Sequence, residues 1–380
     1  MPGPLSGVKV VELAGLGALP FGSLKLADMG ADVVRVDRVS DVPDDPQPRP
    51  QNFWDRGRRS IGVDLKHPRG VETVLRLAAD ADVFLESFRP GVVERLGLGP
   101  DVLLERNPRI VYGRLTGWGQ DGPLAQAAGH SLNYEAITGV TRALGPRGGP
   151  PLPVLQILGD FAGGGLHLAF GVVCALHEAQ RSGRGQVVDA AMVDGVMSLA
   201  SVFYAMQKIG MHTDELGTNL FDGGAPFYNV YETSDGKYVS VAPIEPHFYA
   251  LLLEKLGLNP AELPDQNDRA GWPELRERFA EVFRTRTRDQ WTALLEGTDA
   301  CYAPVLTFGE ARAYDHNVAR GAFIGDDPMP ELLPTPRLSL TPGEAGRSPD
   351  WIGADTESVL GEAGLSIEEV KALREAGAIR

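Results

Sequence analysis

Cysteine is scarce in this sequence. Its 380 residues include two cysteines, Cys174 and Cys301, and no Cys-x-x-Cys or His-x-x-x-His spacing occurs. Disulfide-stabilised secreted domains contain far more cysteine, and zinc sites use such short ligand spacings. The sequence therefore predicts neither a disulfide framework nor a metal centre. Cys174, inside an apolar stretch, is expected to be a small core residue.

A membrane-spanning segment and a secretory signal are not predicted either. No apolar run of about 18 residues stands out, which is the length that a spanning helix needs. The first five residues contain no basic region that leads into an apolar stretch. With 43% hydrophobic and 23% charged residues, the composition is typical of a globular protein. We therefore expect a cytoplasmic protein without a membrane partner.

Positive charge is in deficit overall, but not in every part of the chain. The formal net charge is −15, which argues against non-specific binding of nucleic acid. Residues 1–115 hold 16 basic and 16 acidic residues, so the excess of 35 acidic over 20 basic residues lies in 116–380. A polyanionic ligand is thus expected to bind the N-terminal third. The alternative is that this uneven distribution reflects chance variation in composition.

The first forty residues predict a parallel β-α-β unit. A strand at 8–13 precedes a glycine-rich turn at 14–20, a helix at 21–30 and a second strand at 31–38. The glycines Gly15, Gly17 and Gly22 suggest a dinucleotide site, and Asp37 ends the second strand as a ribose-binding acid would. Their spacing is G-x-G-x(4)-G, however, and Arg38 adjoins Asp37, so the pattern departs from the dinucleotide fingerprint. NAD binding is therefore not predicted.

Basic residues recur near the ends of the predicted strands. Further strands are expected at 61–66, 83–86, 109–115 and 184–192. Arg38, Lys66, Arg89 and Arg95 lie at or just beyond such strand ends, and open α/β sheets bind ligands at the carboxyl ends of their strands. Solvated basic loops remain the alternative explanation for any one of these residues.

The length favours two domains, because 380 residues exceed what one core supports. Residues 1–190 are predicted to form a large, Rossmann-like parallel-sheet domain, and residues 191–224 a linker helix and loop. Residues 225–320 are predicted to form a smaller α+β domain that contains an antiparallel hairpin. A proline-rich tether at 321–355 then leads to two short C-terminal helices within 356–380. The fold class is therefore α/β with a second α+β domain.

Two residues are candidates for proton transfer. His130 follows Gly129 and precedes a predicted helix at 131–138, and Asp160 is expected to open a long apolar helix that ends near residue 180. Imidazole exchanges protons near neutral pH, and the backbone N–H of Ser131 at a helix start would stabilise an enolate oxygen. Taken singly, each residue also fits a structural role. For Asp160 that role is a helix N-cap, a position where Asp is favoured.

Three consecutive glycines follow Asp160 closely. Gly163, Gly164 and Gly165 fall in the first turns of the predicted apolar helix, where each costs roughly 1 kcal/mol of helix propensity. Such a cost indicates that another segment packs very close to the backbone there.

Several motifs resemble the class III CoA-transferase superfamily. They are the segments 159–165 and 185–195, together with Gly-Ala-Asp-Val-Val at 30–34 and Thr-Gly-Trp-Gly at 116–119. The Gly129-His130 pair and the segment Asp-Gly-Gly-Ala-Pro-Phe-Tyr at 222–228 are similar to the α-methylacyl-CoA racemase branch of that superfamily. The resemblance covers nearly the whole chain.

The resemblance implies a fold, an assembly and a site. The family folds into a large CoA-binding α/β domain and a small domain, the C-terminal helices return to the large domain, and two chains interlock as rings in a homodimer. The catalytic residues carry over to His130, Asp160 and Glu245. Contacts with substrate and CoA carry over to Arg38, Arg59, Val63, Lys66, Ser87, Arg89, Arg95, Gly129, Ser131 and Tyr134. No cofactor is implied, since CoA is part of the substrate.

The implied activity is racemisation of 2-methylacyl-CoA thioesters through an enolate. His130, paired with Glu245, would serve one face of the α-carbon and Asp160 the other. The alternative is a CoA transferase in which Asp160 attacks the thioester as a nucleophile, although transferases of the family typically lack the histidine. A third possibility is CoA binding without catalysis. Ser131, where the racemases often have Asp, and the residues of 18–21 depart from the family pattern, so the acyl group stays open among branched fatty, bile-acid-like and aryl-propionyl chains.

Overall fold

The computed structural model describes residues 3–48, 50, 52–325 and 330–380. These residues fold as two compact units. Unit 1 combines the chain up to Thr138 with Val154–Leu199 and Ile324–Arg380, and unit 2 combines Gly139–Pro153 with Ala200–Phe323. The loop at 139–153 thus belongs with unit 2, whereas the sequence placed it in the large domain. Part of the predicted tether, residues 326–329, lies outside the described residues.

Unit 1 is built on a six-stranded sheet in which every neighbouring pair of strands is parallel. The strands stand in the order β3-β2-β1-β4-β5-β6. Their bounds are β1 (Lys9–Leu13), β2 (Asp32–Arg38), β3 (Arg58–Val63), β4 (Val83–Glu86), β5 (Val111–Thr116) and β6 (Val187–Ala191). The predicted α/β class with a parallel sheet is confirmed. The third strand lies three residues earlier than the predicted 61–66, so Arg58 and Arg59 are part of the sheet.

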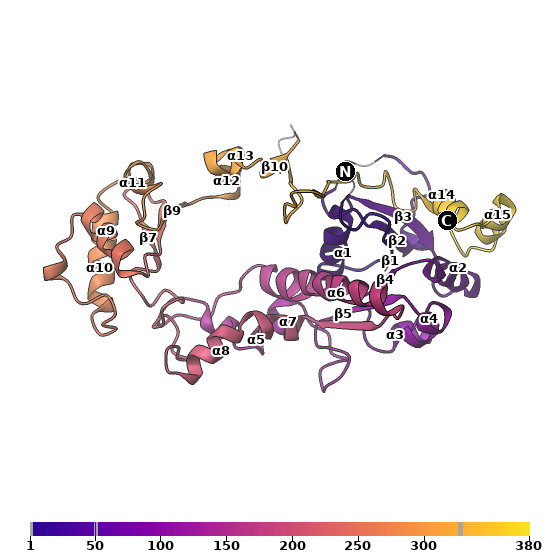
Figure 1. Cartoon of the computed structure of the whole chain (residues 1–380), viewed down its shortest axis with the longest axis horizontal. Coiled ribbons are helices and arrows are strands. Elements are labelled where there is room, and N and C mark those ends of the chain that lie inside the picture. The colour runs from indigo at the N-terminus through magenta and orange to yellow at the C-terminus, as the bar shows by residue number, and fades with distance from the viewer. Residues whose placement is uncertain (1–2, 49, 51, 326–329) are drawn as a thin grey trace. The chain divides into compact units, whose positions relative to one another are not determined.

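Helices cover both faces of this sheet (Figure 1). One core joins the sheet to α2 (Pro68–Ala79), α4 (Pro100–Arg106), α14 (Thr356–Glu362) and α15 (Ile367–Glu375). The other core joins it to α1 (Ala18–Asp28) and α6 (His167–Ser182). Alternate strand residues supply the two cores: Val11 faces one and Val10 the other, as the period of two requires. Because each face of the sheet packs against an apolar core, apolar residues occupy successive positions in the strands, as in Val10 and Val11.

The C-terminal helices α14 and α15 belong to unit 1. A Ser366–Glu369 capping box starts α15, with the Glu369 N–H donating to Ser366 Oγ at 3.2 Å. Beyond α15, Ile379 forms a bridge with Val63, and the Arg380 N–H donates to the Gly62 carbonyl at 3.0 Å. The chain end therefore extends the edge of the sheet beside β3.

The segment around Asp160 differs from the prediction. A π-helix, η3 (Ile157–Leu166), leads directly into α6, so Asp160 lies inside its first turn rather than at the start of the helix. The N-cap is Gln156. The expectation that Asp160 opens the helix is therefore wrong, because the wide turn of η3 begins three residues earlier.

Close backbone packing around the three glycines is confirmed. A Cβ atom on Gly163 would stand 2.8 Å from the Val196 nitrogen in α7 (Met192–Leu199), and one on Gly195 would overlap the Gly163 carbonyl. Gly165 meets α1 in the same way: its Cβ would stand 2.8 Å from the Gly22 nitrogen. The backbone of η3 is therefore held between α1 and α7 with no room for a methyl group at either contact.

Among the described residues, one stretch, Ile157–Ser182, is by length and composition apolar enough to cross a membrane. The sequence did not predict a stretch of this length, because glycines and two histidines interrupt its apolar side chains. In the structure its residues Leu168, Val172 and Leu176 are buried against the sheet. Core helices of globular proteins pass the same test of length and composition.

Unit 2 contains an antiparallel sheet in the order β7-β8-β9, with bounds β7 (Asn229–Glu232), β8 (Tyr238–Val241) and β9 (Tyr302–Val305). The predicted hairpin is confirmed, but the third strand was missed because Pro304 interrupts its pattern. Proline is compatible with this edge position. Its helices are α8 (Ser201–Lys208), α9 (Pro246–Leu256), α10 (Trp272–Phe283), α11 (Arg288–Leu295), α12 (Phe308–Ala313) and α13 (Asp315–Ala319). The core is aromatic, centred on Tyr231, Phe279, Phe283 and Trp291.

The remaining elements are short. They are α3 (Val92–Arg95), α5 (Ser131–Ala136), η1 (Val39–Asp41), η2 (Thr141–Ala143), η4 (Pro260–Glu262), β10 (Phe323–Ile324) and β11 (Glu331–Leu332).

The packing of η3 generates a stability prediction. We expect Gly195→Ala to lower the free energy of unfolding by about 2–3 kcal/mol, because the new methyl group must displace the backbone at Gly163. Gly361→Ala is the matched control: a Cβ atom there meets nothing within 4 Å, so a gain of up to about 1 kcal/mol is expected in a helix. Urea denaturation of both variants checks this, and equal stability of the two would contradict it.

Candidate active site

The site is positioned by the point where the strand order reverses. Successive connections run from β1 outward to β2 and β3, and the chain then returns to β4 on the other side of β1. The loops after β1 and β4 separate at such a point and leave a crevice for ligands. Here Ser87, just beyond β4, presses its hydroxyl against Gly15 in the loop after β1. A side chain at Gly15 would force that hydroxyl to move.

His130 is held as the N-cap of α5. Its backbone is extended, with φ −132° and ψ 171°, and its N–H donates to Asn133 Oδ1 at 3.0 Å. Its side chain is exposed. The backbone is thus tied down while the imidazole remains accessible to a ligand.

Asp160 lies against both the β1 loop and α5. Its Oδ2 atom stands 2.9 Å from the position of a Cβ atom on Gly17, and its backbone N–H donates to Ser131 Oγ at 3.2 Å. Burial raises the pKa of Asp160 above its ordinary value of 3.8, and the nearby imidazole of His130 opposes that rise. The structure therefore brings His130, Ser131 and Asp160 together in unit 1, although thirty residues separate the first and last in sequence.

Tyr134 closes one side of this cluster. It is buried, its hydroxyl donates to the Gly129 carbonyl, and its ring meets Trp118 edge-on with centroids 4.7 Å apart. Burial and the charge of Asp160 raise the pKa of Tyr134, while Arg89 opposes the rise. These interactions place Tyr134 between a predicted catalytic carboxylate and a predicted CoA-binding arginine.

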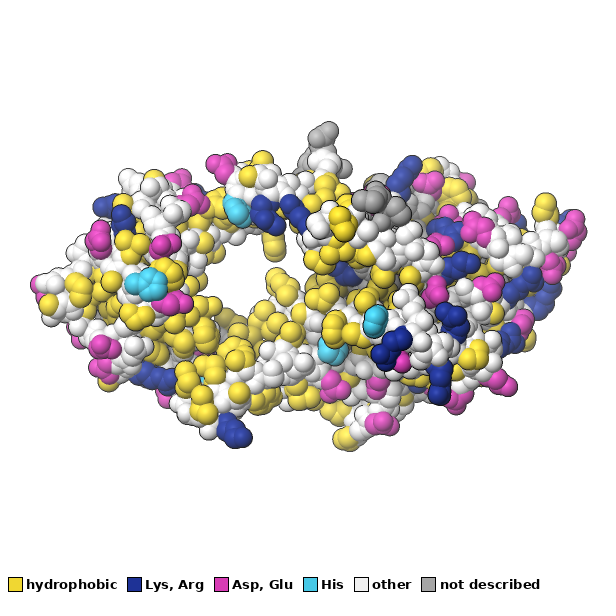
Figure 2. Space-filling model, viewed as in Figure 1, with side chains coloured by type: hydrophobic (Ala, Val, Ile, Leu, Met, Phe, Trp, Pro, Cys, Tyr) yellow, Lys and Arg dark blue, Asp and Glu magenta, His cyan; other side chains and the backbone are white. Residues whose placement is uncertain are grey.

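The predicted CoA-binding residues separate into two groups. Arg38 ends β2, Lys66 follows β3, and Arg89 and Arg95 follow β4; all four are exposed. Figure 2 shows basic side chains gathered over the region of α2, α3 and α4. Val63 is buried at the carboxyl end of β3.

Arg59 lies apart from this group. It stands near the amino end of β3 and forms ion pairs with Asp32 and Glu362. The structure does not bring it to the carboxyl edge of the sheet where the other predicted CoA contacts are found.

Glu245 belongs to unit 2. It is the N-cap residue of α9, its side chain is exposed, and its carbonyl accepts from the Tyr249 N–H at 3.0 Å. Burial and the charge of Glu245 raise the pKa of the Cys301 thiol, so the two side chains lie near each other. The structure describes Glu245 within its own unit and does not relate it to His130.

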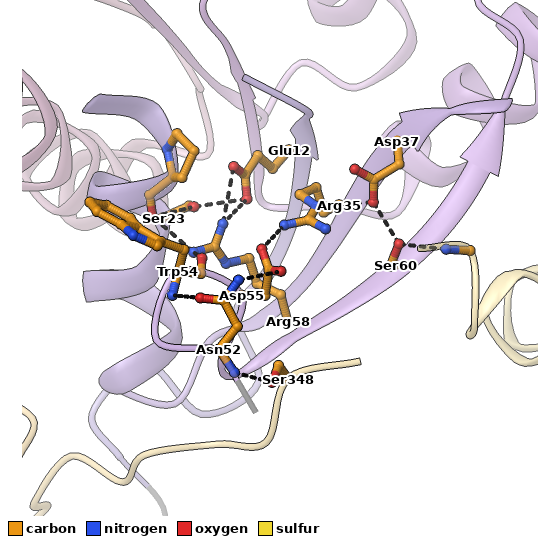
Figure 3. A network of polar contacts seen from close by, with 12 residues as sticks. Glu12, Ser23, Arg35, Asp37, Asn52, Trp54, Asp55, Arg58, Ser60 and Ser348 are labelled. Atoms are coloured by element: carbon orange, nitrogen blue, oxygen red, sulfur yellow. Dashed lines mark hydrogen bonds and ion pairs between the residues drawn. The ribbon is translucent and has the colours of Figure 1, made fainter. Parts of the chain in front are cut away.

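A buried ionic network supports the β1 loop, and sequence reasoning missed it (Figure 3). Glu12 and Arg58 are fully buried side chains that pair at 3.3 Å, and Ser23 Oγ donates to the same carboxylate at 2.8 Å. Arg58 Nη2 also donates to the Pro20 carbonyl at 2.9 Å. These bonds anchor the first turns of α1, which carry Gly17 against Asp160. A signal was available, since Glu12 is a charged residue inside a predicted buried strand.

The network continues across the sheet. Arg35 Nε pairs with Asp37 at 3.0 Å, and Arg35 also pairs with Asp55. The Asp37 carboxylate accepts from Ser60 Oγ at 2.5 Å. Asp37, which the sequence suggested as a ribose-binding acid, is thus committed to internal partners. These internal bonds occupy the carboxylate that a ribose would need, in agreement with the glycine spacing, which departs from the dinucleotide fingerprint.

Comparisons with known proteins settle the family. A family model described as CoA-transferase family III matches residues 5–356. The chain belongs to CoA-transferase family III. It is 48% identical over 369 residues to the protein named alpha-methylacyl-CoA racemase from Mus musculus, and 45% identical over 373 residues to the one from Homo sapiens. In both cases 96% of this chain and 95% of the relative are covered.

A solved structure agrees with this assignment. The chain is similar to a CAIB/BAIF family protein from Brucella suis, with a TM-score of 0.81 and 26% sequence identity. The match covers 96% of this chain and 100% of that chain. The resemblance inferred from the sequence motifs is therefore confirmed.

In this family III chain, the cluster combines two proton carriers of different character. The exposed imidazole of His130 can accept and donate a proton. The half-buried carboxyl of Asp160, with its raised pKa, retains a proton to higher pH than an exposed carboxyl does. Such a pair can remove a proton from one side of a carbon and supply one to another side. Asp160 as an ionised carboxylate can also act as a nucleophile.

The raised pKa of Asp160 predicts a pH-dependent gain of stability on its removal. A carboxyl with a raised folded-state pKa opposes folding only once it is ionised, so the cost is absent below 3.8 and complete above the raised pKa. We expect Asp160→Asn to raise the melting temperature by about 1–2 °C at pH 7, after allowance for solvent screening. The gain is expected to shrink as the pH falls toward 3.8, which calorimetry would measure.

Asp121→Asn, which alters an exposed carboxylate, is the control for this experiment and is expected to leave the melting temperature unchanged. A lower melting temperature for Asp160→Asn at pH 7 would contradict the prediction, since the attraction to His130 would then outweigh the cost of burial.

Proposed function

We propose that this chain is an isomerase that interconverts (R)- and (S)-2-methylacyl-CoA thioesters by 1,1-proton transfer through an enolate. The carrying observation is the juxtaposition of His130 and Asp160 beside Ser131. Relatives that are 45–48% identical over nearly the full length bear the name of this racemase, which supports the same activity here.

The stereochemistry requires two groups on opposite faces of the α-carbon. The thioester acidifies its α-hydrogen because the carbanion is conjugated into an enolate. His130, oriented by Glu245, removes the proton from the (S)-thioester, while protonated Asp160 supplies one to the other face. The reverse reaction starts from ionised Asp160 and protonated His130. A raised pKa of Asp160 favours the protonated form that the first direction needs.

The exposed cations dock the CoA part of the substrate. Phosphates are bound by charge-assisted hydrogen bonds from arginine and lysine, and the four exposed residues are Arg38, Lys66, Arg89 and Arg95. The enolate oxygen is placed against the backbone N–H of Ser131, which has no partner within its own helix. CoA enters as part of the substrate, and no separate cofactor is included in this proposal.

Three aromatic rings flank the acyl end. The ring centroids of Phe21 and Phe161 are 4.8 Å apart, and those of Trp54 and Phe161 are 5.7 Å apart. Phe161 adjoins Asp160 in sequence, and Phe21 lies one turn after Gly17 in α1. Because Trp54 remains 40% exposed, this cluster offers apolar surface beside the reacting carbon. We assign it to the acyl chain, without choosing among branched, steroid-like and aryl groups.

The proposal includes an interlocked homodimer in which Glu245 comes from the partner chain. Three large apolar side chains are exposed at the end of η3 and along α6: Leu166 is 51% exposed, Phe170 68% and Val173 43%. Large apolar side chains grouped on one exposed face are typical of protein–protein interfaces. This surface supports association of two chains.

Exchange with heavy water tests the reaction. We expect the wild-type protein to incorporate deuterium at the α-carbon of both (R)- and (S)-2-methylacyl-CoA and to racemise each, as followed by mass spectrometry and chiral analysis. His130→Ala and Asp160→Ala are each expected to lower the rate by about 100-fold or more, because each removes a group that transfers a proton.

The transferase alternative makes the opposite prediction. If Asp160 acts as a nucleophile, CoA passes to an added carboxylate, no deuterium enters the α-carbon, and His130→Ala leaves the transfer intact. That set of results would replace the racemase proposal.

Mixing inactive chains tests the origin of Glu245. Asp160→Ala and Glu245→Ala are expected to be inactive as separate preparations. Refolded together, they are expected to recover about a quarter of wild-type activity, since random pairing forms half heterodimers and each holds one intact site of its two when Glu245 crosses between chains. Recovery is measured as deuterium exchange. No recovery would place Glu245 and Asp160 in one chain's site.

A further inference from the structure

Glu135 is a buried carboxyl that the mechanism above does not use. It lies in α5, one turn after Ser131, and is 1% exposed. Its Oε1 atom accepts two hydrogen bonds, from Ser131 Oγ at 2.7 Å and from the Gly159 N–H at 2.9 Å. Burial of a carboxyl group costs free energy of folding unless hydrogen bonds compensate for the lost water. The two bonds to Glu135 supply this compensation, one from α5 itself and one from η3.

These two bonds belong to a short relay. Ser131 Oγ donates to Glu135 and also accepts from the Asp160 N–H at 3.2 Å. The consecutive amides of Gly159 and Asp160 are thus both bound from α5, one by the carboxylate directly and one through the hydroxyl. The relay connects the helix that carries His130 to the turn that carries Asp160.

The contact leaves no room for a side chain at position 159. A Cβ atom on Gly159 would stand 2.9 Å from Glu135 Oε1 and 3.0 Å from Ser131 Cα. Two backbones can approach this closely only at glycine. The approach has a direct consequence for chemistry, since it fixes how far the carboxyl of Asp160 lies from the imidazole of His130.

We propose that Glu135 is a positioning residue for proton transfer: through Ser131 it holds the Asp160 turn against the His130 turn, and it keeps a second acidic group beside Asp160. This inference rests on the proposed racemase function. Glu135 does not touch the reacting carbon and acts through Asp160.

The charges around Asp160 have definite signs. On α5, His130 lowers the pKa of Asp160 and Glu135 raises it, while burial contributes the largest upward shift. Tyr134, also on α5, interacts with Asp160 and with Arg89. Loss of the Glu135 charge therefore lets Asp160 ionise at lower pH. Substitution of a residue with a merely structural role would leave the pKa of Asp160 unchanged.

Two substitutions separate charge from geometry. Glu135→Gln keeps an oxygen that accepts both hydrogen bonds but removes the charge. We expect the acidic limb of kcat/KM for the (R)-thioester, in which ionised Asp160 of the free enzyme is the base, to move to lower pH by about half a unit or more, with the plateau changed less than about threefold. Glu135→Leu removes the acceptor as well, and misplacement of Asp160 is expected to lower kcat by about 10-fold to 100-fold with KM little changed.

The control is Glu178→Gln, which removes one partly exposed carboxylate of α6 that pairs with Arg181 at the surface. It is expected to leave both the limb and the plateau unchanged. Circular dichroism of each variant shows whether it folds, and the near-isosteric Glu135→Gln keeps the proposal testable if Glu135→Leu does not fold. A wild-type pH profile for Glu135→Gln, or wild-type kcat for a folded Glu135→Leu, would overturn the inference.

A second measurement does not depend on activity. Amide hydrogen exchange at Gly159 and Asp160 is expected to be at least tenfold faster in Glu135→Leu than in the wild type, because both amides lose ordered acceptors. Unchanged exchange at both amides would overturn the positioning role. If the wild-type protein fails to exchange the α-hydrogen while these amides respond as expected, the racemase proposal fails and the structural relay stands.

Discussion

The close approach of η3 to its neighbours is the constraint on which the candidate site depends. Gly163 and Gly195 allow α7 to lie against its backbone, and Gly22 and Gly165 allow α1 to do the same. Because α1 begins at the β1 loop, the same packing places Gly17 beside the carboxylate of Asp160. The buried Glu12–Arg58 pair holds the other side of α1 through the Pro20 carbonyl. The candidate catalytic carboxyl is thus positioned by backbone contacts that tolerate almost no change in volume.

The electrostatics of the site follow from this packing. Asp160 is half-buried, so its ionised form is penalised, and an acidic neighbour on α5 adds to the penalty. His130 is exposed on the same helix and keeps access to solvent protons. Racemisation needs one group that holds a proton while another lacks one, and their exchange on reversal. An exposed imidazole and a half-buried carboxyl meet that requirement more readily than two identical groups in the same environment would.

Much of the fold was predictable because its elements have regular patterns. Each of the six strands contains valine, and helical segments lie between most successive strands, an alternation that indicates a parallel sheet. The capping box at Ser366 and the hairpin of unit 2 follow from local chemistry. Several predictions failed where the local pattern was misleading; Cys174, for example, is exposed although it lies in an apolar stretch. Pro304 obscured an edge strand, and Asp160 resembled an N-cap although η3 begins before it. The assignment of residues 139–153 to unit 2 has no local signature, because it depends on contacts with residues far along the chain.

The sequence by itself determined the family, the parallel sheet and the identity of the candidate proton carriers. Each of these is indicated by a motif or a hydrophobic pattern within a short stretch of the chain. Only the tertiary structure decided which residues surround them. Glu135 reads as an ordinary helix residue in sequence, yet it binds the Gly159 amide 24 positions later. Arg59 reads as a phosphate ligand, yet it is engaged by Asp32 and Glu362. The physical reason is that hydrogen bonds and ion pairs form between groups that folding brings together. The number of residues between two such groups in the sequence does not predict how close they lie in the folded chain.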